Sequence, residues 1–467
     1  MNLLALLSST ASSLQAQQTV VAVSGDNIDN ASTPGYVQQQ ANLEEVGPGV
    51  VVGNSTVGDG AEVASITRTT DSFVEAQMPA AFSAASSSSA EAQALEGVTV
   101  LDTSSSNDLA SALGNFYSSM EAVTQDAGNT SLRQAAIASA QTLATSFNNT
   151  SQAIESARSG IDSQIAGQVT QVNELAAQVA QLNGQIATIE ASGGNANSLL
   201  DSRQTALDTL AQLAGATTVS AQNGEVSVVL GGGLALVSGN VAGALTATAD
   251  ASNGGHLAVG IELPGSSSSS SLSQGALGGS IGGEIAARDQ VLGTSLASLD
   301  QLAYDFANSV NAVHEAGYGL DGVTGRPLFD VGATASGASG SIAVDPAVAN
   351  DPSALAASAS AAGVPGDGSQ LQALVDTENQ GLTGGLTATQ TLASITTAFG
   401  SAASQAQAVS SQDAGMLTNL QTTRASAEGV SIDEQLINLQ QAQRAYEAVS
   451  RVIQTTSNLL DNLLQLT

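Results

Sequence analysis

The C-terminal stretch VSIDEQLINLQQAQRAYEAVSRVIQTTSNLLDNLLQLT, Val430–Thr467, contains no glycine and no proline. Its apolar residues recur at intervals of seven, which is the spacing of one face of a long α-helix. One row comprises Ile432, Leu439, Tyr446, Ile453 and Leu460, and its neighbour comprises Ala442, Val449, Thr456 and Leu463. At ~1.5 Å per residue, a straight helix over this span is ~55 Å long. We therefore predict a long terminal helix with one apolar stripe.

The N-terminal end carries a second amphipathic helix. Its stripe comprises Leu3, Leu7, Leu14 and Val21, spaced by steps that fit a helix face. The stretch NIDNASTPGY, Asn27–Tyr36, then ends the helix, because Pro34 cannot continue it and Gly35 permits a positive φ. Each terminal helix has one apolar stripe and buries little by itself. We expect the two ends to pair and their stripes to assemble with partner molecules.

Between the ends, the chain alternates between two periodicities. Heptad rows run through 154–189 and 285–313, and a third helical pattern covers 392–427 up to Gly429. We expect these middle rows to form an intramolecular core. The stretch NGEVSVVLGGGLALVSGN, Asn223–Asn240, has two β-rich runs around three glycines and predicts a hairpin. Short strands or a loop are expected over 46–63, and one strand over 341–344 in an otherwise irregular connection.

These patterns predict an elongated, multi-domain, mainly α protein with a β insert. The N- and C-terminal helices pair as a coiled-coil-like rod, next to a central helical bundle and a small β domain. The expected division is residues 1–60 with 425–467 as a terminal assembly domain, 61–214 with 280–424 as a helical rod domain, and 215–279 as a β-rich outer domain.

Composition excludes several classes of partner. The formal charge is −32, from 41 acidic residues against 9 arginines and no lysine, so nucleic acid and anionic membranes would repel the chain. There is no cysteine for a disulfide, a thiolate or a cysteine metal site. Because no basic residue precedes Arg68, the leucine run at the start is not expected to be a cleaved signal peptide. It is also too short to span a membrane.

Catalytic signatures are missing from the sequence. His256 and His314 are the only histidines and lack metal-ligand spacing, and no G-x-S-x-G elbow presents a serine. The glycine-rich stretches have no lysine for a phosphate, and the Asp-Gly pairs at 59–60 and 321–322 do not fit a calcium loop. We therefore expect no enzyme activity, cofactor or metal.

The two ends of the chain resemble bacterial flagellar axial proteins. The pattern N-x-x-N-x-x-T-x-G-Y, formed by Asn27, Asn30, Thr33, Gly35 and Tyr36, resembles their N-terminal motif, and the C-terminal helix resembles theirs. Two stretches in the middle are similar to the hook-associated protein 1 family. They are NANSLLDSRQTALDTLAQLAGATTVSAQNGEVSVVLGGGLALVSG and GGSIGGEIAARDQVLGTSLASLDQLAYDFANSVNAVHEAGYGLDG. IAVDPAVANDPSALAAS, followed by GVPGDGSQLQAL, also fits that family. The departures are the acidity, the missing lysine and the short length, and because of that length we expect no extra outer domain.

This resemblance implies a structural protein of the hook–filament junction, secreted through the flagellar type III channel without a cleaved signal. It implies a ring of identical subunits, with the hook protein and the third hook-associated protein as neighbours. It also implies an export chaperone on the C-terminal helix, and neither nucleic acid nor membrane as a partner. The alternatives are another axial protein, such as the hook protein or the third hook-associated protein, or a secreted adhesin. A hook protein is expected to be β-rich between its ends, and an adhesin to carry a cleaved signal and an anchor.

Overall fold

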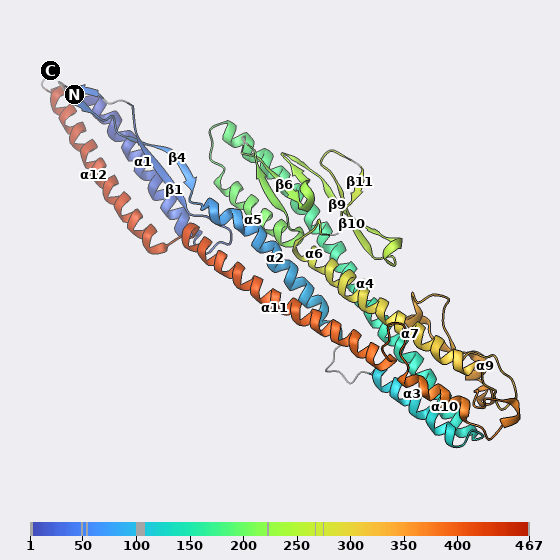
Figure 1. Ribbon diagram of the computed structural model, residues 1–467. Coiled ribbons are helices and arrows are strands. Elements are labelled where there is room, and N and C mark those ends of the chain that lie inside the picture. The colour runs from blue at the N-terminus through green and yellow to red at the C-terminus, as the bar shows by residue number, and fades with distance from the viewer. Residues whose placement is uncertain are drawn as a thin grey trace.

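The computed structural model describes residues 3–47, 50–52, 55–99, 108–221, 224–266, 268–273 and 275–465. The molecule is elongated and mainly helical, and both chain ends lie at the same tip (Figure 1). Long helices run along its length, and small antiparallel sheets cover one flank of the middle. The predicted fold class, an elongated α protein with a β insert and paired terminal helices, is confirmed.

The tip of the molecule is a slender unit that we call the terminal rod, residues 3–70 and 429–465. Helices α1 (Leu3–Asp29) and α12 (Ile432–Gln465) pack side by side along it. Strands β1 (Gln39–Glu45) and β4 (Ala61–Arg68) form an antiparallel ribbon against α1. The short hairpin of β2 (Val50–Val52) and β3 (Ser55–Val57) extends the ribbon, so strands form in the predicted 46–63 region.

The rest of the molecule, which we call the body, is a bundle of long helices. The central helix α4 (Thr130–Ala191) begins at Asn129, whose side chain accepts hydrogen bonds from the Ser131 and Leu132 amides. The apolar rows predicted for it are buried, as Ile154, Ile165, Val172 and Ile186 have no exposed surface. These rows therefore form the body's own core. The other long helices are α2 (Ser72–Glu96), α3 (Asp108–Gln125), α5 (Asn197–Ala214), α6 (Gly279–Ala286), α7 (Gly293–His314) and α11 (Ala388–Glu428), with a π-helical turn at Ala287–Leu292.

Two small sheets lie on one flank of α4. The first contains β5 (Thr217–Ser220), β6 (Val226–Leu230), β7 (Leu234–Ser238) and β8 (Val241–Ala242). The predicted hairpin is confirmed, because β6 pairs with β7 across Gly231–Gly233. The second sheet contains β9 (Ala244–Ala249), β10 (Leu257–Glu262) and β11 (Ser269–Ser271). Side chains of α4 bind both sheets: Asn183 Nδ2 donates to two carbonyls of the first, and Asn173 Nδ2 donates to the Leu245 carbonyl of the second.

The end of the body far from the chain termini is the most irregular part. The strand predicted for 341–344 is the two-residue β13 (Ala343–Val344), which pairs with β12 (Phe329–Asp330), and it follows a helical turn, α8 (Ala338–Ser341). Further short helices are α9 (Pro346–Ala349) and α10 (Ser369–Val375), with 3₁₀ turns at Pro352–Ala354, Ala361–Gly363 and Asp376–Asn379. A further 3₁₀ turn, Ala251–Asn253, connects β9 to β10 in the second sheet.

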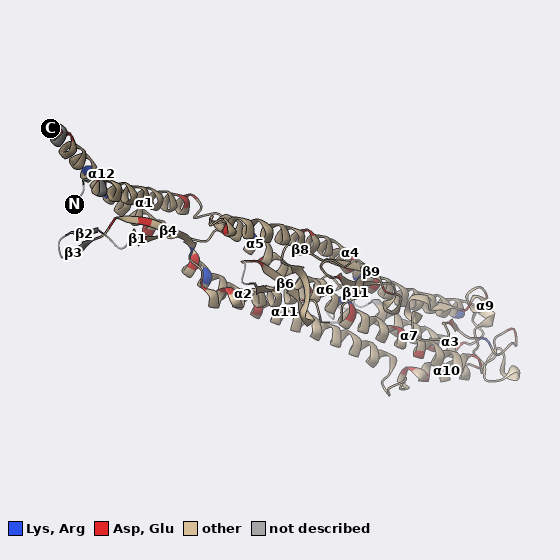
Figure 2. Ribbon diagram, turned by 90° about the horizontal axis from the view of Figure 1, so that it is seen from above, with Lys and Arg blue, Asp and Glu red and all other residues tan. Residues whose placement is uncertain are grey.

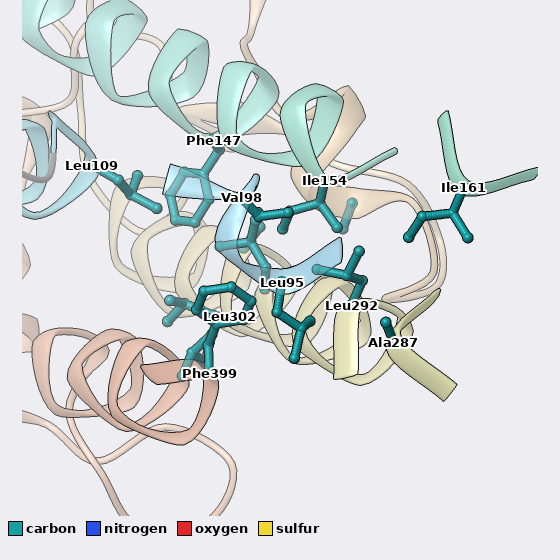
Figure 3. Packing of buried hydrophobic residues seen from close by; sticks show 14 of the residues in the cluster. Leu95, Val98, Leu109, Phe147, Ile154, Ile161, Ala287, Leu292, Leu302 and Phe399 are labelled. Atoms are coloured by element: carbon teal, nitrogen blue, oxygen red, sulfur yellow. The ribbon is translucent and has the colours of Figure 1, made fainter. Parts of the chain in front are cut away.

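A group of aromatic residues packs together at this far end. Phe116, Phe306 and Phe329 form a mutually contacting group with ring centroids 5.5–5.7 Å apart. Phe147 of α4 points toward Leu109, Leu302 and other apolar side chains that come from several helices (Figure 3). Edge-to-face aromatic pairs stabilise such a core beyond the area that they bury. The core is therefore thick here, whereas Ala, Ile and Val dominate along the rest of α4.

We expect Phe306→Ala to lower the free energy of unfolding of the body by about 3–5 kcal/mol, because it leaves a cavity among four aromatic rings. A urea titration followed by circular dichroism measures the change. Phe73→Ala is the matched control, since that ring is 75 % exposed and its loss should cost less than about 0.5 kcal/mol. Equal effects of the two variants would contradict this assignment of the core.

Candidate assembly interface

Asn27, near the end of α1, is the polar centre of the terminal rod. Its side chain is 1 % exposed and makes four hydrogen bonds. Its Nδ2 donates to the Gln39 carbonyl (2.8 Å) and to Gln435 Oε1 of α12 (3.1 Å). Its Oδ1 accepts from the Tyr36 hydroxyl (2.8 Å) and from the Gln39 amide (2.9 Å). One side chain thus joins α1, the turn after it, the first strand of the ribbon, and α12.

The remaining motif residues shape the turn between α1 and β1. Asn30 Nδ2 donates to the Asp26 carbonyl (2.9 Å), and the Thr33 hydroxyl donates to Asn30 Oδ1 (3.2 Å). Gly35 has φ +80°, and a Cβ there would lie 2.5 Å from Thr205 Oγ1 of the body, so the position requires glycine on two counts. The structure therefore brings the five predicted motif residues together.

The hydroxyl of Tyr36 stays protonated well above neutral pH. Burial, followed by the nearby Asp26 and Asp201 carboxylates, raises the pKa of this hydroxyl to about 12. The hydroxyl is therefore a lasting hydrogen-bond donor to Asn27. The ring of Tyr36 is half-buried at the turn, where its hydroxyl holds Asn27.

The predicted apolar stripes only partly face each other. Leu7, Leu14 and Val21 on α1 are half-buried, as are Leu439, Tyr446, Ile453 and Leu460 on α12. Ile432 is 49 % exposed, and the side chains of Leu3 and Leu463 lie outside the described part of the chain. The fully buried positions are smaller or polar: Ala16, Val23 and Ser24 on α1, and Gln435, Ala442 and Thr456 on α12. Small residues let the two helices approach closely, which leaves the larger side chains at the margins of the contact. The assembly role of these residues stays a prediction.

The terminal rod meets the body at a joint built around Arg424, near the end of α11. Its guanidinium lies 2.7 Å from Asp208 Oδ2, 3.4 Å from Glu428 Oε2 and 2.6 Å from Glu75 Oε1. The contact with Glu75 is electrostatic, because Oε1 accepts no hydrogen bond from any described residue. One cation therefore faces three carboxylates from α2, α5 and α11.

Glu428, the last residue of α11, connects this charge cluster to the terminal rod. Its side chain accepts from the Asp71 amide (2.9 Å), and its carbonyl accepts from the Gln38 amide (3.0 Å). Beside it, Arg68 Nε of β4 lies 2.6 Å from Asp201 Oδ1 of α5. Asn197 Nδ2 donates to the Ile66 carbonyl (3.2 Å). Polar contacts thus connect the ribbon to the body on two sides.

The joint has a titratable carboxyl. Burial, opposed by Arg424 and reinforced by Glu428 and Asp208, raises the pKa of Glu75 to about 7. Near neutral pH this carboxyl therefore exchanges between a neutral form and an anion that faces two further acids. Sequence reasoning missed this cluster, since its residues lie far apart in the chain and nothing in their spacing shows that they meet.

Both histidines have structural hydrogen bonds. His314 Nδ1 donates to the Arg326 carbonyl (2.7 Å), and its Nε2 accepts from the Ala356 amide (2.9 Å). Burial lowers the pKa of His314 to about 4, which keeps the ring neutral as these bonds require. His256 lies between Asp162 and Glu155 of α4. The described residues contain no acid–histidine group arranged for a metal, and none of their helices is long and apolar enough to cross a membrane.

A paired set of chain ends, an asparagine-centred turn and a polar joint to a helical body define an elongated axial protein. Residues 96–329 match the family described as flagellar hook-associated protein FlgK helical domain. Residues 423–466 match the C-terminal family of the flagellar basal body rod FlgEFG proteins. The class is therefore that of flagellar axial proteins. Because the first match covers half of the chain, the chain belongs to the flagellar hook-associated protein FlgK family.

Individual relatives agree with this assignment. Flagellar hook-associated protein 1 of Bacillus subtilis is 27 % identical over 97 % of this chain and 96 % of its own length. The protein of the same name from Escherichia coli is 25 % identical over 70 % of this chain, and the match spans 60 % of its length. The structure titled flagellar hook junction protein FlgK, from Burkholderia pseudomallei, has a TM-score of 0.67 at 22 % identity and covers 77 % of this chain and 100 % of that one. The structural likeness supports the fold.

We expect Asn27→Ala to destabilise the terminal rod by about 2–3 kcal/mol, since it leaves buried backbone and side-chain groups without partners. Hydrogen exchange of the α1 and α12 amides measures the change. Asn30→Ala is the control, because its hydrogen bonds are exposed and should contribute less than about 1 kcal/mol. Unchanged protection in the Asn27 variant would show that the pairing of the helices does not depend on this residue.

We also expect the joint to weaken as the pH rises. The folded pKa of Glu75 lies above its ordinary value of 4.5, so its contribution to stability is complete below pH 4.5 and is lost as the pH passes through about 7. Glu75→Gln should be more stable than the parent at pH 8, by about 1–2 kcal/mol, and should show less change between pH 5 and pH 8. Urea unfolding at both pH values measures this, with exposed Glu121→Gln as control. Identical pH dependence in the parent and the Glu75→Gln variant would refute it.

Proposed function

We propose that this protein forms the junction between the hook and the filament of the bacterial flagellum, where it caps the hook and provides the platform on which the filament assembles. The observation that carries the proposal is the paired α1–α12 terminal rod with its asparagine-centred turn, in a chain that belongs to the FlgK family. The solved Burkholderia relative is described as a hook junction protein. The function is that of a structural component with no catalytic step.

Assembly uses the terminal rod in this proposal. The assembly domain, which lies in the inner tube, comprises residues 1–60 and 425–467. The body forms the outer rod. The β region of residues 215–279 faces outward. A free chain leaves Ile432, Ile437 and Leu459 exposed by about half, at 49 %, 56 % and 53 %. Exposed apolar side chains that repeat along one helix mark an interaction surface. Neighbouring copies cover them in a ring.

The partners follow from this position. The protein contacts further copies of itself, the hook protein on one side and the third hook-associated protein on the other. It leaves the cell through the flagellar export channel, with an export chaperone on the C-terminal helix beforehand. The apolar residues of α12 are only half-buried, so they need a covering partner before assembly. This supports the contact between α12 and an export chaperone.

Other axial positions are the nearest alternatives, namely hook protein or third hook-associated protein. The long helical body between the ends favours the junction over the hook, for which a β-rich middle is expected. A secreted adhesin is a more distant alternative, and it would leave the flagellum unaffected when the gene is altered.

Deletion of Val430–Thr467 in the native host tests the proposal. It removes α12, so we expect hooks to remain, filaments to disappear and flagellin to accumulate in the medium. Electron microscopy counts the filaments, and immunoblotting measures the shed flagellin.

The control is a chain of full length in which the exposed Phe73 is replaced by alanine, which should keep normal filaments. Circular dichroism of the truncated chain shows whether the body stays folded. Normal filaments on cells that produce only the truncated chain would overturn the junction function and favour the adhesin.

A further inference from the structure

Two arginines of this strongly acidic molecule have no partner among the described residues. Arg444 and Arg451 are exposed on α12, and their guanidinium groups take part in no ion pair or hydrogen bond within the described chain. The other seven bind carboxylates, carbonyls or amides: Arg68, Arg133, Arg158, Arg203, Arg288, Arg326 and Arg424. Basic residues are rare along the whole ribbon diagram (Figure 2). The two exposed cations on α12 therefore stand apart from the other arginines.

The two arginines face away from α1. Arg444 follows the buried Gln435 by nine residues and Arg451 follows the buried Ala442 by nine, which is a rotation of about 180° around the helix. They are seven residues apart and so lie on one face. Exposed Ile437, seven residues before Arg444, lies on the same side at 56 % exposure. We call this surface, Ile437, Arg444 and Arg451, the outer face of α12.

A complementary surface lies on the ribbon. Glu44 of β1 is directly opposite Glu62 of β4, both are exposed, and no arginine of the described chain pairs with either. Like charges directly opposite each other in a sheet destabilise the pairing unless a cation compensates them. We call Glu44 and Glu62 the acidic face of the ribbon.

The two faces lie on different sides of the terminal rod. In both views α1 lies between α12 and the β1–β4 ribbon (Figures 1 and 2). One chain therefore cannot join its own outer face to its own acidic face. An interface that unites them has to use two copies, head to tail, which generates a ring or a helical tube instead of a closed dimer.

The two faces also lie at the same height along the rod. The hydrogen bond between Asn27 and Gln435, near the joint, gives a common reference point on α1 and α12. Along α12, Arg444 lies about 14 Å and Arg451 about 24 Å from Gln435. The ribbon reaches α1 where the Ala61 amide donates to Ser13, about 21 Å from Asn27 along that helix. Because Glu62 follows Ala61, its height falls between those of the two arginines. Copies placed side by side bring the charges together without sliding along the rod.

We propose that neighbouring copies of this chain bind each other through these faces, with Arg444 and Arg451 of one copy against Glu44 and Glu62 of the next. This inference rests on the proposed assembly function and names the residues that carry the lateral contact. Complementary charges select the correct neighbour and fix the register between copies. The chain's own acidity then repels every other orientation.

Charge exchange in the full-length chain tests the interface. We expect Arg444→Glu/Arg451→Glu to reduce the number of filaments per cell at least tenfold, and Glu44→Arg/Glu62→Arg to do the same. The chain with all four changes restores the contact with reversed charges and should recover at least half of the wild-type number. Glu121→Arg/Glu174→Arg, on exposed positions of the body, is the control for added positive charge and should leave filaments normal.

A cross-link provides a second measurement that does not depend on filament number. The chain has no cysteine, so Glu62→Cys/Arg451→Cys introduces the only pair. Oxidation of isolated hook–filament structures should give a ladder of linked copies, and Glu121→Cys/Arg451→Cys should give none. Absence of the ladder, or a four-residue exchange no better than the double variants, would overturn this interface. Loss of filaments on deletion of Val430–Thr467 would still hold in that case, so the two proposals fail separately.

Discussion

The antiparallel contact between α1 and α12 is the constraint on which the rest of the structure depends. It joins residues more than four hundred positions apart, as the Asn27–Gln435 hydrogen bond illustrates. Once the ends are paired, every intervening element has to leave the tip and return to it. The body is consequently a set of long helices that run out and back, with α2 against α11 next to the joint. The contact itself is narrow, because small and polar residues occupy its centre.

The joint between the terminal rod and the body is polar, unlike the core of the body. Charges and hydrogen bonds of Arg424, Glu428 and Asp201 connect α11, α5 and the ribbon. Apolar cores resist rearrangement because they are closely packed, whereas a hydrogen-bonded contact can change partners at lower cost. A joint of this kind suits a subunit whose rod and body have to fit different neighbours. The raised pKa of Glu75 makes it the most pH-sensitive place in the connection.

The acidity of the chain has a structural pattern. Arginines are used where they bind carboxylates or carbonyls inside the molecule, as Arg288 binds Asp162 and Asp289 at 2 % exposure of its side chain. The chain has 41 acidic residues against these 9 arginines. Against that background, the two exposed arginines on one face of α12 are the basis of the lateral contact that we propose.

The sequence by itself determined the two terminal helices, the helical rows over 154–189, 285–313 and 392–427, and the hairpin at Gly231–Gly233, because these depend on local periodicity and on glycine and proline chemistry. It did not predict α2, α3 or α5, which have no row of that length in the pattern. It also pointed to the family through the five-residue motif and the C-terminal helix. Only the tertiary structure decided which residues of each stripe are buried, since Ile432 and Leu439 belong to the same row but Ile432 is exposed and Leu439 half-buried. It alone assembled the Arg424 cluster, whose members are up to 353 positions apart, from Glu75 to Glu428. Contacts between such distant residues depend on the packing of whole helices, and no local pattern encodes that packing.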